Sequence, residues 1–494
     1  MRSVFAAFLL SLGVSALLTP LVRRWALRAG AVDAGGGRKI HAGAIPRLGG
    51  LAIVMGFFAP LTGLLVMDAG INRLFLQDER KVVGLFAGGL LIALLGIYDD
   101  FKGANAPKKF LVQFVVAALL WHAGFRVELV SNPFGEAINL GWLGLPVTLL
   151  WITGVINALN LIDGLDGLAG GVAVFVLATL FALGYLQDRV LVCLLCAALG
   201  GATLGFLFYN FNPATIFMGD TGSLFLGFVI AAMSIWGSQK SSTAVAVAIP
   251  LLALGLPLAD TALAMFRRAL RGRSMFQADR EHIHHKLLDL GLTQRQAVLV
   301  LYGACMVLAG ASLAMVYLTS AEATALLVVV AAVAVVIFHR MGYLGLDAVR
   351  REVTVGRAES RAFRERRDAV RAAFLRGERG QFNSQLALEA LRECAQHVGY
   401  TESTLHLNPP ALGVTTQQHL GFRLDDGDAV TGLTARYQLE GRGGLLGEVV
   451  YIFRDGRTRL NPDDASLLDL IHDHLLDRME ETRGAVVVPL RRVM

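Results

Sequence analysis

The chain has 494 residues, of which 55% are hydrophobic and 17% are charged, and its mean hydropathy is +0.56. This composition excludes an ordinary soluble protein and predicts a polytopic membrane protein. The formal net charge is only +6, and we expect no nucleic-acid partner. The four cysteines do not predict a disulfide framework, because Cys193 and Cys196 lie inside an apolar run, where such a pair is more often packing than a metal or redox site.

Apolar runs divide the first two thirds of the chain. They lie at residues 3–22, 49–67, 82–98, 110–125, 142–158, 168–186, 190–209, 223–237, 243–266, 297–318 and 322–340. Each is long enough, or nearly long enough, to cross a bilayer as a helix. The first run is expected to be retained, because no small-residue cleavage pattern follows Pro20. We therefore expect an all-α polytopic membrane protein with about 11 transmembrane helices in residues 1–342.

The basic residues indicate the orientation of these helices. The loops at 23–48, 99–109 and 267–295 hold six, three and seven Lys or Arg, whereas all loops on the opposite side hold seven together. Loops rich in Lys and Arg stay in the cytoplasm, so the sequence predicts an external amino terminus. The motifs described below all lie in loops on the predicted cytoplasmic side.

The last third of the chain has a different character. Residues 343–380 are predicted to form a charged helical linker, and residues 381–494 a small soluble cytoplasmic α/β domain. The segments beginning at Val430 and Leu446 alternate like half-buried strands, and a closing amphipathic helix follows. The late strands and final helix faintly resemble a GAF-type sensor module, although no ligand motif stands in them. Packing or oligomerisation is the expected role of this domain.

A polar segment stands at the end of one apolar run. It places Asn157, Asn160, Asp163 and Asp166 at intervals of three residues, directly before a group of glycines. If the helix continues, these side chains converge on one face. Polar groups beside hydrocarbon are costly and persist mainly where they bind something. The segment therefore predicts an active-site loop that suits a cation and its ligand, although a polar turn that caps the next helix is an alternative.

Two further loops supply carboxylates. Asp99 and Asp100 stand where another apolar run meets water, and adjacent acids favour a nearby cation, a proton or Lys102. A third loop contains Gly219-Asp220-Thr-Gly-Ser223, in which glycines free backbone N–H groups for anions and Asp220 offers a hard oxygen ligand. The hydroxyl residues of this loop have a helix-capping role as an alternative.

Two loops supply cationic and imidazole side chains. The candidate residues in them are Lys39, His41, Arg47, Arg280, His282, His284 and His285. Some of them are alternatively only topology signals, which is the common role of basic residues beside a membrane. A zinc site is disfavoured, because the histidines do not follow His-Glu-x-x-His and no His/Cys set completes a tetrahedron. Acids facing these cations predict Mg²⁺ and a phosphorylated substrate.

These motifs together resemble the polyprenyl-phosphate N-acetylhexosamine-1-phosphate transferase family over roughly residues 1–320. The resemblance rests on Arg38-Lys-Ile-His41 with Pro46-Arg-Leu-Gly-Gly50, Tyr98-Asp-Asp100, the segment from Asn157 to Gly167, Ile216-Phe-Met-Gly-Asp-Thr-Gly-Ser223 and Asp279-Arg-Glu-His-Ile-His-His285. It implies transfer of a sugar 1-phosphate from a UDP-N-acetylhexosamine to undecaprenyl phosphate, release of UMP, and a requirement for Mg²⁺, with Mn²⁺ as a substitute. It also implies a bacterial inner-membrane location.

The sequence departs from the family pattern at two places. The position of a frequent third acid is Gly103 here, which puts any role for a third acid in doubt. The peptidoglycan branch has three consecutive histidines, whereas this chain has His282-Ile-His284-His285, as in the branch that uses donors like UDP-N-acetylglucosamine. The resemblance therefore favours N-acetylglucosamine 1-phosphate and initiation of a lipid-linked glycan such as O-antigen or capsule. Transfer of phospho-MurNAc-pentapeptide is the alternative within the family.

The expected roles follow from this resemblance and from phosphoryl-transfer chemistry. Asp220 with Asn160 or Asp163 would hold Mg²⁺, and Asp99 or Asp100 would deprotonate or orient the lipid phosphate. The residues expected to bind substrate are Lys39, His41, Arg47, Lys102, Asn157, Asp166, Arg280, His282, His284 and His285.

Two rival classes and the assembly state stay open at this point. A secondary transporter also has many helices and buried acids, but carriers place such groups near the membrane midplane and often contain repeats, and we find no repeat. A membrane sensor would need a ligand motif in the tail. A homodimer is compatible with the sequence.

Overall fold

The structure of the protein is a computed structural model. It describes residues 2–33, 45–67, 69–130, 138–238, 248–270, 282–340, 346–375, 384–407, 418–423, 433–441, 444–455 and 460–487. The chain forms two compact units, one with Met1–Arg268 and Ala278–Ala348 and the other with Ala269–Gln277 and Val349–Met494. Each unit has a hydrophobic core of its own.

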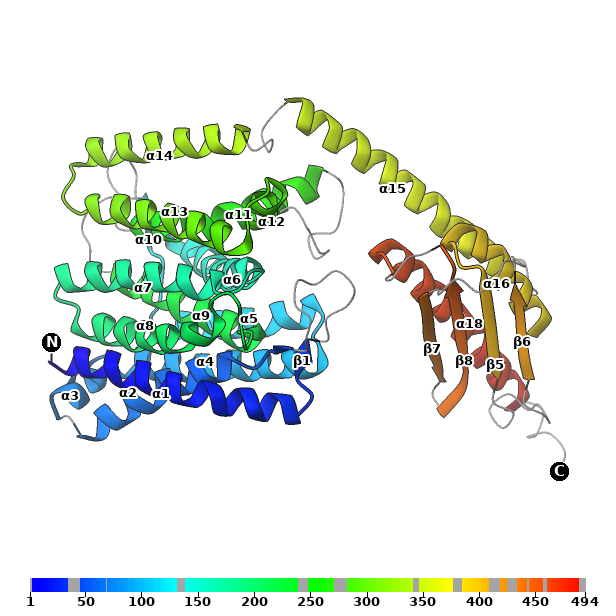
Figure 1. The fold of residues 1–494 in the computed structure, drawn as a ribbon, viewed down its shortest axis with the longest axis horizontal. Coiled ribbons are helices and arrows are strands. Elements are labelled where there is room, and N and C mark those ends of the chain that lie inside the picture. Colours follow the sequence, from blue (N-terminus) through cyan, green and yellow to red (C-terminus); the bar gives the residue numbers. More distant parts are fainter. Residues whose placement is uncertain are drawn as a thin grey trace. The chain divides into compact units, whose positions relative to one another are not determined.

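The first unit is a bundle of helices (Figure 1), and it also contains two very short antiparallel strand pairs. Its helices are α1 (Arg2–Arg28), α2 (Gly50–Met67), α3 (Ala69–Gln77), α4 (Glu79–Lys102), α5 (Ala106–Ala123), α6 (Gly144–Ile162), α7 (Leu168–Leu186), α8 (Val190–Asn210), α9 (Gly219–Ser238), α10 (Ala248–Ala253), α11 (Gly255–Leu270), α12 (Ile283–Asp289), α13 (Gln294–Ala314) and α14 (Ser320–Arg340). A 3₁₀ turn, η1 (Gly141–Leu143), precedes α6. The antiparallel strand pairs are β1 (Val32–Asp33) with β2 (Ile45–Pro46) and β3 (Leu129–Val130) with β4 (Ile138–Asn139).

Nine of the described helices are long and apolar enough to cross a membrane. They are α1, α2, α4, α6 with η1, α7, α8, α9, α13 and α14. The multi-pass character predicted from the sequence is therefore confirmed, whereas the number eleven is not. The run expected at 110–125 is α5, whose first turn carries Lys108 and Lys109. The run expected at 243–266 begins outside the described residues and is broken between α10 and α11.

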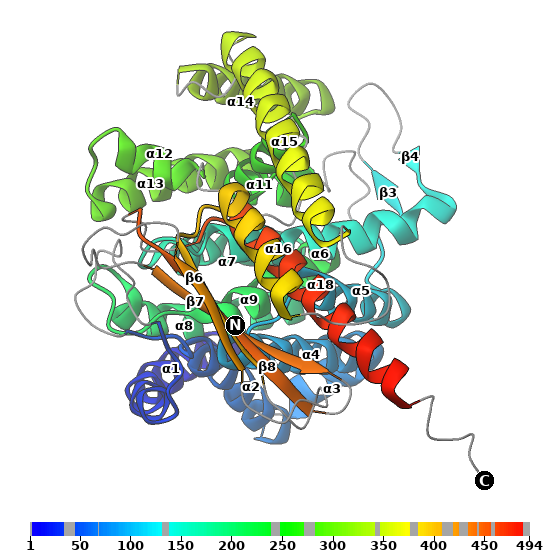
Figure 2. The same cartoon turned by 90° about the vertical axis from the view of Figure 1, so that its right-hand side faces the viewer.

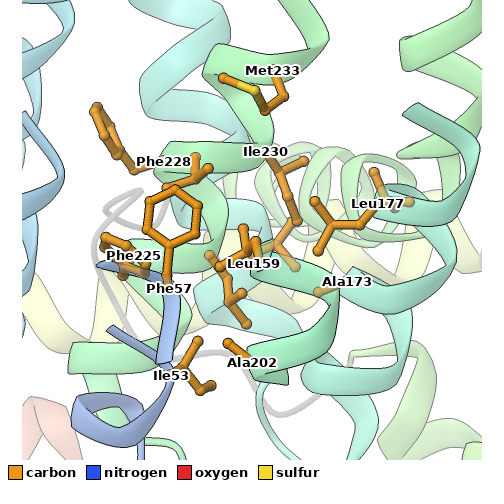
Figure 3. Close-up of a cluster of buried hydrophobic side chains, with 14 of the residues drawn as sticks. Ile53, Phe57, Leu159, Ala173, Leu177, Ala202, Phe225, Phe228, Ile230 and Met233 are labelled. Carbon is orange, nitrogen blue, oxygen red and sulfur yellow. The ribbon is translucent and has the colours of Figure 1, made fainter. Parts of the chain in front are cut away.

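Helix α9 occupies the centre of the first unit. Every residue from Thr221 to Gly237 is buried. Figure 3 shows Phe225 of α9 in one cluster with Phe57 of α2, Leu159 of α6 and other apolar side chains. Packing of this kind holds helices together where lipid replaces water. The beginning of α9 is consequently fixed by neighbours on several sides.

Polar side chains collect where α4 and α6 end and where α5 and α9 begin. Asp99 and Asp100 lie in the last turn of α4, and Lys109 lies in the first turn of α5. Asn160 lies in the last turn of α6, and Asp220 is the second residue of α9. The contacts described below join these four helix ends, so they meet at one end of the bundle.

The second unit combines an antiparallel sheet with helices (Figures 1 and 2). Its elements are α15 (Leu346–Leu375), α16 (Ser384–Val398), β5 (Glu402–Leu407), β6 (Gln418–Arg423), β7 (Leu433–Gly441), β8 (Gly444–Phe453) and α18 (Pro462–Val487). The strand order is β6-β5-β8-β7, and Leu405 pairs with Leu420 on one side and Val449 on the other. These three residues pack in one cluster with apolar side chains of α16 and α18. The strands expected from Val430 and Leu446 correspond to β7 and β8.

Helix α15 belongs to the core of the second unit. Val370, Ala373 and Phe374 of α15 are buried in the same cluster as the sheet. Arg366 forms an ion pair with the buried Asp464 of α18. The segment expected to be a charged linker, 343–380, is helical over most of its length, but its second half packs as part of the domain that follows.

Candidate functional site

Four helix ends meet in a cluster of acids around one lysine, which we call the acid–lysine cluster: Asp99, Lys109, Asn160 and Asp220. The Lys109 ammonium lies 2.6 Å from Asp99 Oδ2 and 2.5 Å from Asp220 Oδ2. The Asn160 amide donates hydrogen bonds to Asp220 Oδ1 at 3.1 Å and to Ser223 Oγ at 2.9 Å. Both oxygens of Asp220 are thus held from other helices.

Asp100 holds the beginning of α9. Its carboxylate accepts hydrogen bonds from the backbone N–H of Asp220 at 2.9 Å, from the N–H of Thr221 at 3.0 Å and from the Thr221 hydroxyl at 2.6 Å. The first N–H groups of a helix have no partner inside the helix, and a carboxylate there also meets the positive end of the helix dipole. Asp100 is only 8% exposed, so these bonds fix Asp220 relative to α4.

Gly219 allows this close approach. Its φ is +70°, and a Cβ there would lie 2.0 Å from the Arg47 carbonyl oxygen and 2.7 Å from both Asp100 oxygens. A side chain at this position would therefore separate α9 from α4 and from the segment around Arg47. The glycine before Asp220 is required by geometry.

Asp163 follows the last residue of α6. Its loss of solvation, together with repulsion from Asp220, Asp100 and Asp166, raises the pKa of Asp163 to about 8. A carboxyl surrounded by other carboxylates favours a proton or a cation. The site accordingly has an excess of negative charge beyond what Lys109 compensates.

Asp166 links two of the predicted motif loops. Its Oδ2 accepts hydrogen bonds from the Asn212 side chain and from the backbone N–H of Ala214, each at 3.0 Å. The carbonyl of the next residue, Gly167, accepts a hydrogen bond from the Tyr302 hydroxyl at 2.6 Å. Asp166 thus holds the loop before α9 against the loop after α6, and Tyr302 of α13 adds a hydrogen bond at the same place.

The segment around Arg47 is joined to the loop before α9 by backbone hydrogen bonds. The N–H of Phe217 donates to the Pro46 carbonyl at 2.8 Å, and the N–H of Gly49 donates to the Phe217 carbonyl at 3.0 Å. The Nε of Arg47 is buried and has no hydrogen-bond partner within the described part of the chain. An unpaired guanidinium N–H beside the acid-rich site is available to an anionic ligand.

The histidines form a stack supported by an acid from α11. His282 Nδ1 lies 2.9 Å from Asp260 Oδ2, and the backbone N–H of Ile283 donates to Asp260 Oδ1 at 2.9 Å. The rings of His282 and His284 are parallel within 3° with centroids 5.7 Å apart, and the His285 ring lies 4.4 Å from that of His284. The three imidazoles are therefore one packed group.

His284 touches the loop that carries Asp163 and Asp166. A Cβ on Gly164 would lie 2.4 Å from His284 Nε2, so only a glycine leaves room for the ring. Burial, followed by the neighbouring His285, lowers the pKa of His284 to about 4. The ring is therefore neutral at physiological pH, and its Nδ1 has no hydrogen-bond partner among the described residues.

The remaining predicted residues lie apart from this contact network or outside the described residues. Asn157 donates to Gln113 Oε1 and to the Thr153 carbonyl, each at 2.7 Å. The Lys102 ammonium lies 5.9 Å from the centroid of the Tyr98 ring, and no contact in the described part of the chain joins it to Asp99 or Asp220. Lys39, His41 and Arg280 lie outside the described residues.

Sequence reasoning missed Lys109 and Asp260. Lys109 was counted only as one of the basic residues of the loop at 99–109, although a lysine in the first turn of an apolar helix could have suggested a buried partner. Asp260 stands inside the apolar run predicted at 243–266, where an acid is costly. The position of Asp260 inside an apolar run could therefore have indicated that it pairs with a functional residue.

The acid–lysine cluster has donors that suit a hard divalent cation. Among the described residues, no group of three or more His, Cys, Asp or Glu is placed to hold a metal ion by itself. Mg²⁺ commonly takes only one or two protein carboxylates and completes its shell with water and substrate phosphates. Asp99 and Asp220 already accommodate a positive charge at 2.5–2.6 Å in the form of Lys109. These residues therefore fit Mg²⁺ bound together with a phosphorylated ligand.

The sequence of this chain is similar to a known protein family and to several named proteins. Residues 82–238, which contain the acid–lysine cluster, match the family model described as "Glycosyl transferase family 4". The chain is 43% identical over 303 residues to a Bacillus subtilis protein named "Probable undecaprenyl-phosphate N-acetylglucosaminyl 1-phosphate transferase", a match that covers 61% of this chain and 82% of that protein.

Two further relatives carry related names. The Mycolicibacterium smegmatis protein "Decaprenyl-phosphate N-acetylglucosaminephosphotransferase" is 34% identical over 58% of this chain and 75% of its own length. The Listeria welshimeri protein "Phospho-N-acetylmuramoyl-pentapeptide-transferase" is 34% identical over 44% of this chain and 70% of its own length. Each match leaves a substantial part of this chain uncovered.

Proposed function

The chain belongs to the polyprenyl-phosphate N-acetylhexosamine-1-phosphate transferase family, and we propose that it transfers N-acetylglucosamine 1-phosphate from UDP-N-acetylglucosamine to undecaprenyl phosphate, releasing UMP. The observation that carries this proposal is the acid–lysine cluster, which joins four helix ends of a multi-pass membrane protein. A carrier would be expected to place its ionisable groups near the membrane midplane instead.

The choice of donor rests on two observations. Relatives with 43% and 34% identity are named for N-acetylglucosamine. The histidine segment is His282-Ile-His284-His285, and it is not the run of three histidines expected for the peptidoglycan branch. Transfer of phospho-MurNAc-pentapeptide remains the second candidate, because one relative is named for it.

The reaction forms one P–O bond and breaks another. An oxygen of the lipid phosphate attacks the phosphorus that carries the sugar, and the bond between that phosphorus and the oxygen of the UMP phosphate breaks. Asp99 orients the lipid phosphate and accepts its proton if one is present. Lys109 lies beside Asp99 and compensates part of the charge that the two anions bring together.

Other residues hold the donor. Asp220, with the side-chain carbonyl oxygen of Asn160 or with Asp163, would hold Mg²⁺, for which Mn²⁺ would substitute. When bound, the ion neutralises negative charge on the diphosphate. Arg47 and the histidine stack donate hydrogen bonds to the remaining phosphate oxygens. Asp100 serves as a positioning residue, because the beginning of α9 already occupies both of its oxygens.

The cellular setting follows from charge and chemistry. The excess of Lys and Arg in the loops on the side of the motifs favours a cytoplasmic site. Undecaprenyl phosphate as the acceptor points to the bacterial inner membrane and to the first step of a cell-envelope glycan such as O-antigen or capsule.

A donor competition tests the proposal. Purified protein receives Mg²⁺, undecaprenyl phosphate and radiolabelled UDP-N-acetylglucosamine, and label in the lipid phase is measured with increasing unlabelled UDP-MurNAc-pentapeptide or UDP-N-acetylglucosamine. We expect label in the lipid phase, and competition only by the second compound. Loss of lipid-phase label with UDP-MurNAc-pentapeptide as the competitor would favour the peptidoglycan reaction instead.

A further inference from the structure

A buried carboxylate outside the acid–lysine cluster supports the histidine stack. Asp260 of α11 is 2% exposed and His282 is 5% exposed. One Asp260 oxygen accepts the backbone N–H of Ile283, and the other lies 2.9 Å from His282 Nδ1. A buried carboxylate is costly unless its oxygens are paired, and both oxygens are paired here.

This arrangement determines which ring nitrogen of His282 carries the permanent proton. An ionised carboxylate only accepts hydrogen bonds, so Nδ1 must be the donor. Nε2 is then the ring nitrogen left for a ligand, and no hydrogen bond joins it to the described residues. We propose that Asp260 is a positioning residue that keeps the proton of His282 on Nδ1 and directs Nε2 to the phosphates, an inference that rests on the proposed function.

The contact between Asp260 and His282 also affects the loop that carries Asp163 and Asp166. The His282 ring is parallel to that of His284, and His284 fills the space above Gly164 between Asp163 and Asp166. The contact between Asp260 and His282 therefore also sets the place of the stack relative to that loop. In this way Asp260 couples α11 to the loop that carries Asp163 and Asp166.

The variant Asp260→Asn tests whether Asp260 directs the proton of His282 or only holds the beginning of α12 in place. An asparagine can keep its carbonyl oxygen toward the Ile283 N–H and present its NH₂ group to His282 Nδ1. The ring must then accept at Nδ1 and hold its single proton on Nε2, so it can still donate to a phosphate oxygen but cannot carry the positive charge of a ring that is protonated on both nitrogens. The anchor of α12 is retained, while the proposed property is lost.

The kinetic test is a double-mutant cycle with Asp260→Asn, His282→Gln and the double variant. We expect each single variant to lower kcat and kcat/KM together by about 10- to 100-fold, the range seen when the partner of a functional histidine is removed. The double variant should be no slower than His282→Gln. Asp289→Asn, at an exposed acid on α12, is the matched control and should keep the wild-type rate. Losses that multiply in the double variant would overturn the proposal.

A second readout does not depend on turnover. In ¹⁵N-histidine-labelled protein, the ring signals that disappear in His282→Gln should show the Nδ1–H tautomer or the doubly protonated ring, and Asp260→Asn should convert them to the Nε2–H pattern. An Nε2–H pattern in the wild type overturns the proposal even if Asp260→Asn does not fold. If the wild type transfers no sugar phosphate but shows the expected tautomer, the proposed function fails while the role of Asp260 in directing the proton stands.

Discussion

Lys109 places a positive charge between Asp99 and Asp220, the two acids to which we assign the lipid phosphate and the metal. Its side chain is 21% exposed, so water screens these contacts only in part. The Lys109 ammonium compensates the repulsion between these two carboxylates, which come from distant parts of the sequence. Under the proposed function, a divalent cation would share these carboxylates with Lys109.

Lys109→Met should lower the stability of the protein in the absence of metal and should increase the stabilisation that added Mg²⁺ gives. Loss of hydrogen bonds to charged groups should lower the free energy of unfolding by about 1.5–3 kcal/mol in EDTA. Mg²⁺ should then raise the thermal midpoint more in the variant than in the wild type, because binding stabilises the folded state. The neighbouring exposed Lys108→Met is the control. Equal Mg²⁺ responses in all three proteins would show that Lys109 does not share ligands with the cation.

His284 should make the protein sensitive to acid. The unfolded state takes up a proton near pH 6.5, whereas the folded state does so only near pH 4, so stability falls as the pH decreases below about 6.5. At pH 5 this difference amounts to about 2 kcal/mol. Between pH 7.5 and pH 5, the thermal midpoint should therefore fall less in His284→Gln than in the wild type or in the exposed control His122→Gln. Identical pH curves would contradict the neutral, buried ring.

Helix α9 is held at its beginning by a side chain from α4. Asp100 binds two backbone N–H groups and one hydroxyl there, while the adjacent Asp99 reaches Lys109. Two neighbouring acids in the sequence thus face different partners. We assign contact with substrate to Asp99 and positioning of α9 to Asp100.

Variants of the two acids should differ in stability. Asp100→Asn places an NH₂ group toward the N–H donors of α9 and should lower the free energy of unfolding by about 1–3 kcal/mol, together with activity. Asp99→Asn should lower activity with a smaller effect on stability, because its amide oxygen can still accept a hydrogen bond. Thermal unfolding and kcat are measured for both. An Asp100→Asn protein as stable as the wild type but inactive would instead make Asp100 a catalytic residue.

Most of these helices could be predicted from the sequence, whereas the side-chain contacts between them could not. Apolar runs predicted most helices, because length and hydropathy decide what crosses a bilayer. The spacing of Asn160 and Asp163 predicted an active-site loop, but not that Asn160 holds Asp220, which lies 60 residues away in the sequence. Lys109 and Asp260 were missed because their partners come from other helices. Such pairs depend on packing, which periodicity does not reveal.

The molecule as a whole divides into a membrane unit and a second unit with its own core. The acid–lysine cluster and the histidine stack both lie within the first unit. The sheet of the second unit packs with α15, α16 and α18. This organisation predicts that the membrane unit works alone, whereas the resemblance of the tail to a GAF-type module stays a prediction.

Truncation after residue 345 removes α15 and everything that follows, and it should leave a membrane-inserted, active transferase. Cutting at the end of α15 instead would leave Val370 and Phe374 without the side chains they pack against and should cause aggregation. Transfer rates of full-length and truncated protein are compared at equal membrane abundance. Loss of activity with an intact membrane unit would mean that the tail takes part in catalysis.

UMP release by purified protein tests whether the acid–lysine cluster performs sugar-phosphate transfer. With UDP-N-acetylglucosamine, undecaprenyl phosphate and Mg²⁺, the wild type should release UMP in step with formation of the lipid-linked product. Asp220→Asn should lower this rate by at least about 100-fold, as expected for loss of a main electrostatic contact. The exposed control Asp188→Asn should keep the wild-type rate. Near-normal UMP release by folded Asp220→Asn protein would contradict the account.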